Sequence, residues 1–165
     1  MIENPIKIIS NRKMEIALVL LVILVFINSI NRYFDHDELE HIHAAWYMFQ
    51  GDIIYMDFFQ HHHPLLYVLL LPLFTIFDEI NIIYAAIVLI FIMNCLMLFI
   101  TYRISRIFSD DHKTAIMALI FLITSNHYYT SMLTIRPDVP YVLFGLAGTY
   151  FALKMIKDLK SKYLY

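Results

Sequence analysis

The sequence contains few charged residues, few glycines and prolines, and a single cysteine. Asp, Glu, Lys and Arg make up 16% of its 165 residues, whereas an average soluble domain contains roughly 25%. Three glycines and five prolines are too few for a low-complexity chain. Cys95 alone excludes a disulfide within the chain, and its place in an apolar run favours a small core residue.

Apolar side chains are abundant instead. They make up 61% of the chain, and the mean hydropathy is +0.67. We find no basic tract interleaved with exposed aromatic residues, which argues against nucleic acid as a partner. The composition is typical of a polytopic membrane protein in contact with membrane lipids, and we treat residues 1–165 as a single membrane domain.

Long apolar runs predict four transmembrane helices, over Met14–Ile30, Ile80–Tyr102, Thr114–Met132 and Val139–Ala152. The first run also resembles a signal peptide. An uncleaved anchor is favoured, because no small-residue cleavage site follows it and further apolar runs do. The run Pro64–Phe77 would reach about 21 Å as a helix, too short for a hydrocarbon core of about 30 Å. We expect it to be an interfacial or re-entrant helix. Because backbone groups at membrane depth must pair internally, we expect an all-α fold.

The distribution of basic residues predicts the topology. If Pro64–Phe77 does not cross, the cytoplasmic segments carry ten of the 12 Lys and Arg residues, and only Arg32 and Arg136 lie outside. If it crosses, four lie inside and eight outside. The positive-inside rule favours the first arrangement. It predicts a multi-pass protein of the cell (cytoplasmic, inner) membrane with both termini cytoplasmic. An outer loop over residues 31–79 would then face the same compartment as Asp138.

Within this outer loop, the stretch from Asp35 to Tyr67 contains six of the 14 acidic residues and six of the eight histidines. Helical spacing from Asp37 to Gln50 predicts an amphipathic helix that lies flat at the headgroup level. On it, Asp37, Glu40 and His41 share one face. A carboxylate there could act as a general base or help to hold a metal. The alternative is that Asp37 and Glu40 form a capping box and only satisfy free backbone N–H groups.

Two further groups of polar residues could carry chemistry. The triplet from His61 to His63 follows Asp57. One or two of these histidines could ligate a divalent metal with a carboxylate, or donate hydrogen bonds to a phosphate. A solvated, pH-sensitive loop is the alternative. Between the last two apolar runs, Arg136 and Asp138 form a charged pair that could meet an anionic ligand. The alternative there is an ordinary loop in which the arginine snorkels.

The order of these features resembles a known family. A first span leads to Asp37-Glu38, then to Gly51-Asp52 and Tyr55-Met56-Asp57, then to Phe58-Phe59-Gln60-His61-His62-His63-Pro64-Leu65, and later to Arg136-Pro137-Asp138. This series is similar to the start of the lipid-carrier-dependent glycosyltransferases of the GT-C class. It is most similar to the protein mannosyltransferase and aminoarabinose transferase group, including its Rgt-like bacterial members.

The resemblance implies a glycosyltransferase that moves a sugar from a polyprenyl-phosphate carrier to an acceptor, of unknown identity, at the outer face of the membrane. It makes Asp37 the catalytic base and Asp138 a second catalytic carboxylate that positions a metal or the acceptor. It places His61 and His62, with Glu38 and Arg136, near the substrate. A divalent metal ion, if used, would involve Asp138 and His62.

The chain departs from the family pattern in three respects. Many relatives have Glu where Gln60 stands and Pro where His63 stands, which weakens any assignment of metal ligands in this stretch. Family members are also longer, so we expect this chain to be the N-terminal part of a larger GT-C module, inactive if it stands alone. The alternative function is a non-catalytic metal-handling or transport subunit that uses the histidines and carboxylates of the outer loop. Transport usually needs polar groups near the bilayer midplane, and the apolar runs contain few.

Overall fold

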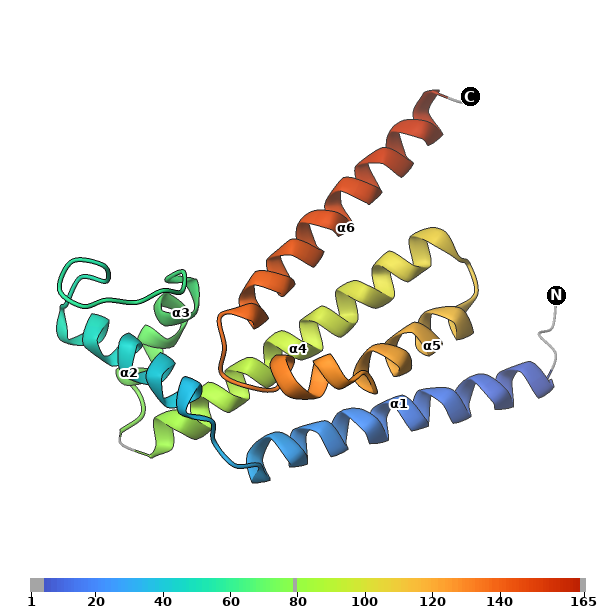
Figure 1. Cartoon of the computed structure of the whole chain (residues 1–165). Helices are drawn as coiled ribbons and strands as arrows, with labels where there is room; N and C mark the ends of the chain where they lie inside the picture. Colours follow the sequence, from blue (N-terminus) through green and yellow to red (C-terminus); the bar gives the residue numbers. More distant parts are fainter. Residues whose placement is uncertain (1–4, 79, 164–165) are drawn as a thin grey trace.

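The computed structural model describes residues 5–78 and 80–163, and every regular element in this part of the chain is a helix, as the sequence predicts. In chain order the elements are α1 (Pro5–Asn31), α2 (His36–Gln50), α3 (Leu65–Phe74), α4 (Asn81–Phe108), α5 (His112–Ile123), the π-helix η1 (Tyr128–Met132) and α6 (Asp138–Tyr163). Figure 1 shows α1, α4 and α5 side by side, with α2 and α3 at one end of the layer and α6 leaving it at an angle.

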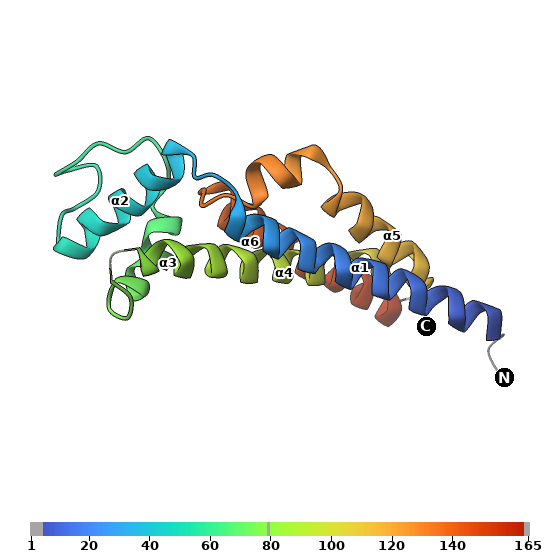
Figure 2. The same ribbon diagram turned by 90° about the horizontal axis from the view of Figure 1, so that it is seen from below.

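Three helices are long and apolar enough to cross a membrane. These segments are Arg12–Asn31 of α1, Asn81–Phe108 of α4 and Asp138–Leu159 of α6. They confirm three of the four expected spans, and the protein is a membrane protein. α4 has 28 residues, about 42 Å at 1.5 Å per residue, so it extends beyond a hydrocarbon core of about 30 Å. The surplus length reaches beneath α2 and α3, as Figure 2 shows from below.

The fourth expected span, over Thr114–Met132, is not confirmed as one continuous helix. α5 has 12 residues, about 18 Å, and ends at Ile123, before η1 begins at Tyr128. The hydroxyl of Thr124 donates to the Ile120 carbonyl and that of Ser125 to the Leu122 carbonyl, both at 2.8 Å. Such side-chain bonds compete with the regular backbone ladder and end the helix.

α5 and η1 together nevertheless run along α1 in the opposite direction. At one end His112 Nε2 lies 2.8 Å from a Glu15 carboxylate oxygen, and at the other Arg32 donates to the Leu133 carbonyl at 3.0 Å. The 17 residues of α1 from Glu15 to Asn31, which directly precedes Arg32, correspond to about 26 Å of helix. The broken segment therefore brings the chain back to the end of the molecule where α1 finishes.

α2 and α3 pack against each other at this end. Asp35 is the N-cap of α2, and Glu38 at the third helical position accepts a hydrogen bond from the Asp35 N–H at 3.1 Å. The alternative that made Asp37 and Glu40 a capping box is therefore wrong, because the helix starts two residues earlier. α2 ends at Gly51, whose φ of 105° is left-handed and suits a residue without a Cβ.

α3 is too short to cross a membrane, as expected. Its 10 residues extend about 15 Å, and Pro72 lies near its end. The hydroxyl of Thr75 donates to the Pro72 carbonyl at 2.7 Å where the helix stops. Buried Leu66, Tyr67 and Leu70 form the face that packs on α2.

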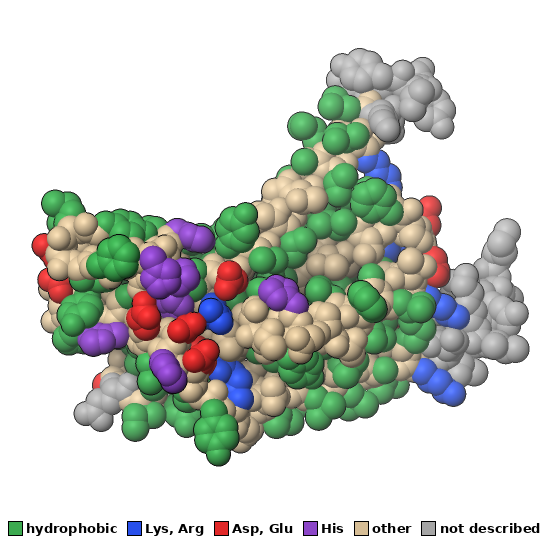
Figure 3. All heavy atoms as spheres, viewed as in Figure 1, with side chains coloured by type: hydrophobic (Ala, Val, Ile, Leu, Met, Phe, Trp, Pro, Cys, Tyr) green, Lys and Arg blue, Asp and Glu red, His purple; other side chains and the backbone are tan. Residues whose placement is uncertain are grey.

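Charged side chains and histidines gather at the two ends of the molecule. In Figure 3, acidic, histidine and basic side chains lie together at the end that carries α2 and α3, and further basic and acidic side chains lie at the opposite end. Hydrophobic and uncharged atoms cover the surface between the two groups. This is the distribution expected of a protein whose middle part is surrounded by lipid.

Labelling of single cysteines tests the crossing by α4. In a Cys95→Ser background, Asp57→Cys and Asp110→Cys place thiols at two exposed positions, on either side of α4 along the chain. In sealed vesicles a membrane-impermeant maleimide should label each position from one side only, and the two positions from opposite sides. In the wild-type protein, the native Cys95 within α4 should resist the reagent from both sides. Labelling of both new cysteines from one side would show that α4 does not cross.

Candidate functional site

The predicted site residues meet where α1 ends, α2 begins and η1 leads into α6. Asp37 and Glu38 lie in the first turn of α2. Arg136 lies between η1 and α6, and Asp138 opens α6. The histidine triplet lies in the loop before α3. The structure therefore places Asp37 and Asp138 at the same end of the molecule, as the count of basic residues predicted.

Glu38 is fully buried and forms a bidentate ion pair with Arg32. Its carboxylate also accepts hydrogen bonds from the backbone N–H groups of Ile135 at 2.8 Å and Asp35 at 3.1 Å. Arg32 in turn donates to the Leu133 carbonyl at 3.0 Å. These bonds join the end of α1, the start of α2 and residues 133–135. Protein donors thus occupy both oxygens of Glu38, an arrangement that gives this residue a positioning role.

Asp37, the neighbour of Glu38, turns the other way. It faces Arg136, whose Nη2 lies 3.0 Å from Asp37 Oδ2 and whose Nε lies 3.7 Å from Asp138 Oδ2. The side chains of Arg136, Asp37 and Asp138 are 29%, 49% and 57% exposed. One guanidinium therefore bridges the two carboxylates that the sequence marked as catalytic, and all three groups can be reached from outside.

Gln60 holds the histidine loop against α2. This buried side chain donates to Glu40 at 3.1 Å, and its oxygen accepts from the backbone N–H groups of His61 at 2.8 Å and His62 at 3.3 Å. The hydroxyl of Tyr55, a residue with a left-handed φ of 69°, donates to the His62 carbonyl. The loop is therefore tied to α2 by side-chain hydrogen bonds, while His61 and His63 stay exposed, as in the alternative of a solvated, pH-sensitive loop.

The three histidines of the loop point to different neighbours. The His62 ring lies 3.9 Å from that of His61 and 4.9 Å from that of His41, between ring centres, and the His63 ring lies 5.9 Å from Tyr141 of α6. Burial is the largest cause that lowers the pKa of His62, and the neighbouring His61 is the next. Asp138 raises this pKa. His62 is thus the member of the triplet that lies nearest to the charged cluster.

His41 belongs to this site, although the sequence placed it only on the same helical face as Asp37. It is 1% exposed, and its Nδ1 lies 3.2 Å from the Tyr67 hydroxyl. Its pKa is lowered to about 4, mostly because the ring is buried and next because His62 lies beside it. Arg32 was also missed as a site residue. Its position as one of only two basic residues expected on the outer side was the available signal.

The residues present do not assemble a preformed metal site. Among residues 5–78 and 80–163, no group of three or more His, Cys, Asp or Glu side chains has a geometry that could hold a metal ion. Arg136 already places a positive charge between the carboxylates of Asp37 and Asp138. His62 and Asp138, the predicted metal ligands, therefore lie beside a guanidinium, so the donor set does not fit a divalent metal as arranged.

Two neighbouring substitutions distinguish the buried acid from the exposed one. Glu38→Gln leaves a buried guanidinium without its counter-ion and should lower the free energy of unfolding by about 3–5 kcal/mol. Asp37→Asn removes a half-exposed pair and should cost only about 0–1 kcal/mol. Thermal unfolding in detergent, followed by circular dichroism, measures both. Equal stability of the two variants would contradict the positioning role of Glu38.

The chemistry of this site has to be argued from its own residues. No family model, no curated protein and no solved structure matches the chain. The resemblance to GT-C glycosyltransferases therefore stays an expectation drawn from the order of the motifs.

Proposed function

We propose that this protein transfers a sugar from a polyprenyl-phosphate carrier to an acceptor hydroxyl at the outer surface of the cell membrane. The observation that carries the proposal is the bridge formed by Arg136 between Asp37 and Asp138. It lies between the end of one candidate span, at Asn31, and the start of another, at Asp138. A base, a cation and apolar helices are thus adjacent, which suits a lipid phosphate and a hydroxyl that arrives from water.

The proposed orientation places this site outside and the N-terminus in the cytoplasm. In support, Arg32 and Arg136 are the basic residues at the site, whereas Arg103, Arg106 and Lys113 lie near the end of α4 and the start of α5. The positive-inside rule assigns the second group to the cytoplasm. We further infer that α5 and η1 form a fourth, broken crossing, because they follow α1 for about 26 Å. Non-helical backbone at that depth is tolerated where protein covers it.

In the proposed reaction the donor phosphate competes with Asp37 for Arg136. A guanidinium binds two phosphate oxygens well, and this contact would leave the Asp37 carboxylate free. The acceptor oxygen then attacks the anomeric carbon while the bond from that carbon to the phosphate oxygen breaks. Asp37 takes the hydroxyl proton, and the phosphate leaves with the bonding electrons. The attack from the opposite side inverts the anomeric configuration.

The main requirement of this reaction is electrostatic. Negative charge grows on the departing phosphate, and fixed donors aimed at it lower the barrier. Arg136 supplies the cation, and His61 and His62 lie on the loop next to it. Asp138 holds the second side of Arg136 and is placed to orient the acceptor. Arg32 and Glu38 keep residues 133–136 beside α2, so they act through position.

The arrangement of polar groups favours this function over a transport subunit. A conduction path needs polar side chains along the spans. Of the buried polar side chains described in the three long helices, Ser29 and Asn94 both donate to backbone carbonyls. The acidic and histidine side chains gather at the end of the molecule that carries α2 and α3 (Figure 3). Chemistry at the membrane surface accounts for this better than a path through the membrane.

Binding of farnesyl phosphate, compared with farnesol, tests the role of Arg136. Trp46 is the only tryptophan and lies on α2, so its fluorescence reports ligands at this end. Arg136→Gln should weaken farnesyl phosphate binding at least tenfold, whereas Asp37→Asn should retain or tighten it, because it frees the guanidinium. Arg103→Gln, at the other end of α4, is the matched control. In membranes supplied with undecaprenyl-phosphate sugars, Asp37→Asn should abolish release of undecaprenyl phosphate. Unchanged release would remove the base role.

Chelation tests whether a metal takes part. Because Arg136 already provides a positive charge between the carboxylates, EDTA should leave the affinity for farnesyl phosphate unchanged within a factor of two. The same fluorescence titration measures it. The opposite result would be that EDTA lowers the affinity and that Mn²⁺ or Mg²⁺ restores it. If Asp138→Asn or His62→Gln removes this dependence on the metal, these two residues are assigned to a metal.

A further inference from the structure

His41 carries a buried hydrogen-bonding nitrogen that has no partner. The side chain is 1% exposed, and Nδ1 is bonded to the hydroxyl of Tyr67 at 3.2 Å. Nε2 is buried, and no residue within the described ranges 5–78 and 80–163 bonds to it. A buried polar atom left unpaired costs about 1–3 kcal/mol, and most such atoms in native proteins are satisfied. An exception next to a charged cluster calls for a ligand or a functional reason.

The partner of Nδ1 fixes which proton the ring carries. Among the residues that the structure describes, the buried Tyr67 hydroxyl has no hydrogen-bond partner other than His41. A buried hydroxyl has to donate its proton, so Tyr67 donates and Nδ1 accepts. The neutral ring then carries its proton on Nε2. The unpaired atom is therefore an N–H donor.

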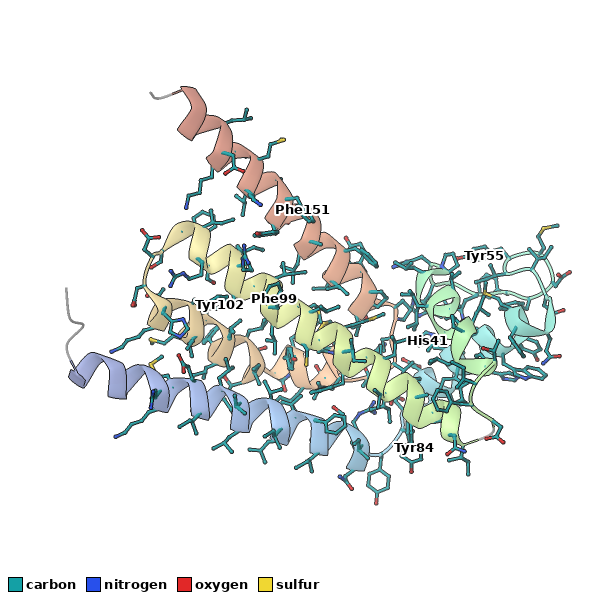
Figure 4. All side chains as sticks on the ribbon, turned by 180° about the vertical axis from the view of Figure 1, so that it is seen from behind. His41, Tyr55, Tyr84, Phe99, Tyr102 and Phe151 are labelled. Carbon is teal, nitrogen blue, oxygen red and sulfur yellow. The ribbon has the colours of Figure 1, made fainter. Side chains whose placement is uncertain are left out.

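The surroundings of this donor come from four parts of the chain. The titratable and charged groups that affect the pKa of His41 are Asp37 and Glu40 on α2, Arg136 before α6 and His62 on the loop. The ring of Tyr67, on α3, packs against the ring of His41. The ring of His62 meets that of His41 nearly edge-on, at 4.9 Å and 72°. Figure 4 labels His41 in the region between α3 and the start of α6. Because the pKa is about 4, the ring is neutral near pH 7.

We propose that the Nε2–H of His41 is a binding donor for the phosphate of the lipid-linked donor, and that the ring of His62 covers it until this ligand enters. This inference rests on the function proposed above and names a residue of the same site. Phosphate oxygens only accept hydrogen bonds, so they match an N–H beside a guanidinium. A neutral donor strengthens phosphate binding without a second cation next to Asp37. That matters because Asp37 must stay able to take a proton.

Nitrogen NMR of histidine-labelled protein in detergent micelles tests the proposal. The His41 signals are assigned by their loss in His41→Gln and by their shift in Tyr67→Phe. In the wild type they should show the Nε2–H form from pH 5 to 8. Farnesyl phosphate should shift the Nε2–H resonance downfield, and farnesol should not. A histidine that only packs in the core would keep the same spectrum with both compounds.

Affinities for farnesyl phosphate complete the test. His41→Gln should weaken binding about fivefold to twentyfold, while His43→Gln, an exposed histidine on the same helix, should leave it unchanged. If Arg136→Gln abolishes binding but the His41 resonance does not move, His41 is a packing residue and this inference fails alone. If the wild type does not distinguish farnesyl phosphate from farnesol, the proposed function fails as well. Should His41→Gln not fold, the wild-type spectra, assigned through Tyr67→Phe, still decide.

Discussion

The buried ion pair between Arg32 and Glu38 determines how the end of this protein that carries α2 and α3 is arranged. Burying two charges is expensive, and the attraction between them compensates only when the remaining hydrogen-bonding groups are also satisfied. Here the Ile135 and Asp35 N–H groups complete the carboxylate, and the Leu133 carbonyl accepts from the guanidinium. Asp35 is the N-cap of α2, whereas Leu133 and Ile135 both lie in the segment before α6. The pair therefore holds α1, α2 and the approach to α6 together, and it is formed only when all three are in place.

The position of the reactive cluster follows from this pair. Successive residues of an α-helix point about 100° apart, so an inward Glu38 leaves the preceding Asp37 facing outward. Ile135, whose N–H bonds to Glu38, directly precedes Arg136. The same backbone contact thus brings the Arg136 guanidinium to 3.0 Å from Asp37. Of the two adjacent acids, one is buried and fixes the geometry, and the other stays half exposed.

The sequence could predict the features that depend on composition and periodicity. Apolar runs predicted α1, α4 and α6, and the count of basic residues placed Asp37 and Asp138 at one end. Burial of Glu38 could not be predicted, because it depends on Arg32 and on a segment about 100 residues away. His41 shares a helical face with Asp37, and α3 and the histidine loop, both distant in sequence, cover it. The break after Ile123 was missed although the sequence carries a signal for it, because residues 124–131 are all polar or aromatic and the apolar run stops at Ile123.

The broken helix and the site are consequences of the same backbone irregularity. A continuous helix through residues 124–136 would bond the Ile135 N–H to the Ser131 carbonyl and would not offer this donor to a neighbour. In the structure the Met132 carbonyl accepts from Asn94 Nδ2 at 2.7 Å, the Leu133 carbonyl accepts from Arg32, and the Ile135 N–H donates to Glu38. Buried backbone groups need such partners. The irregular backbone after η1 therefore leaves the Ile135 N–H free to bond to Glu38, and this contact brings Arg136 beside Asp37.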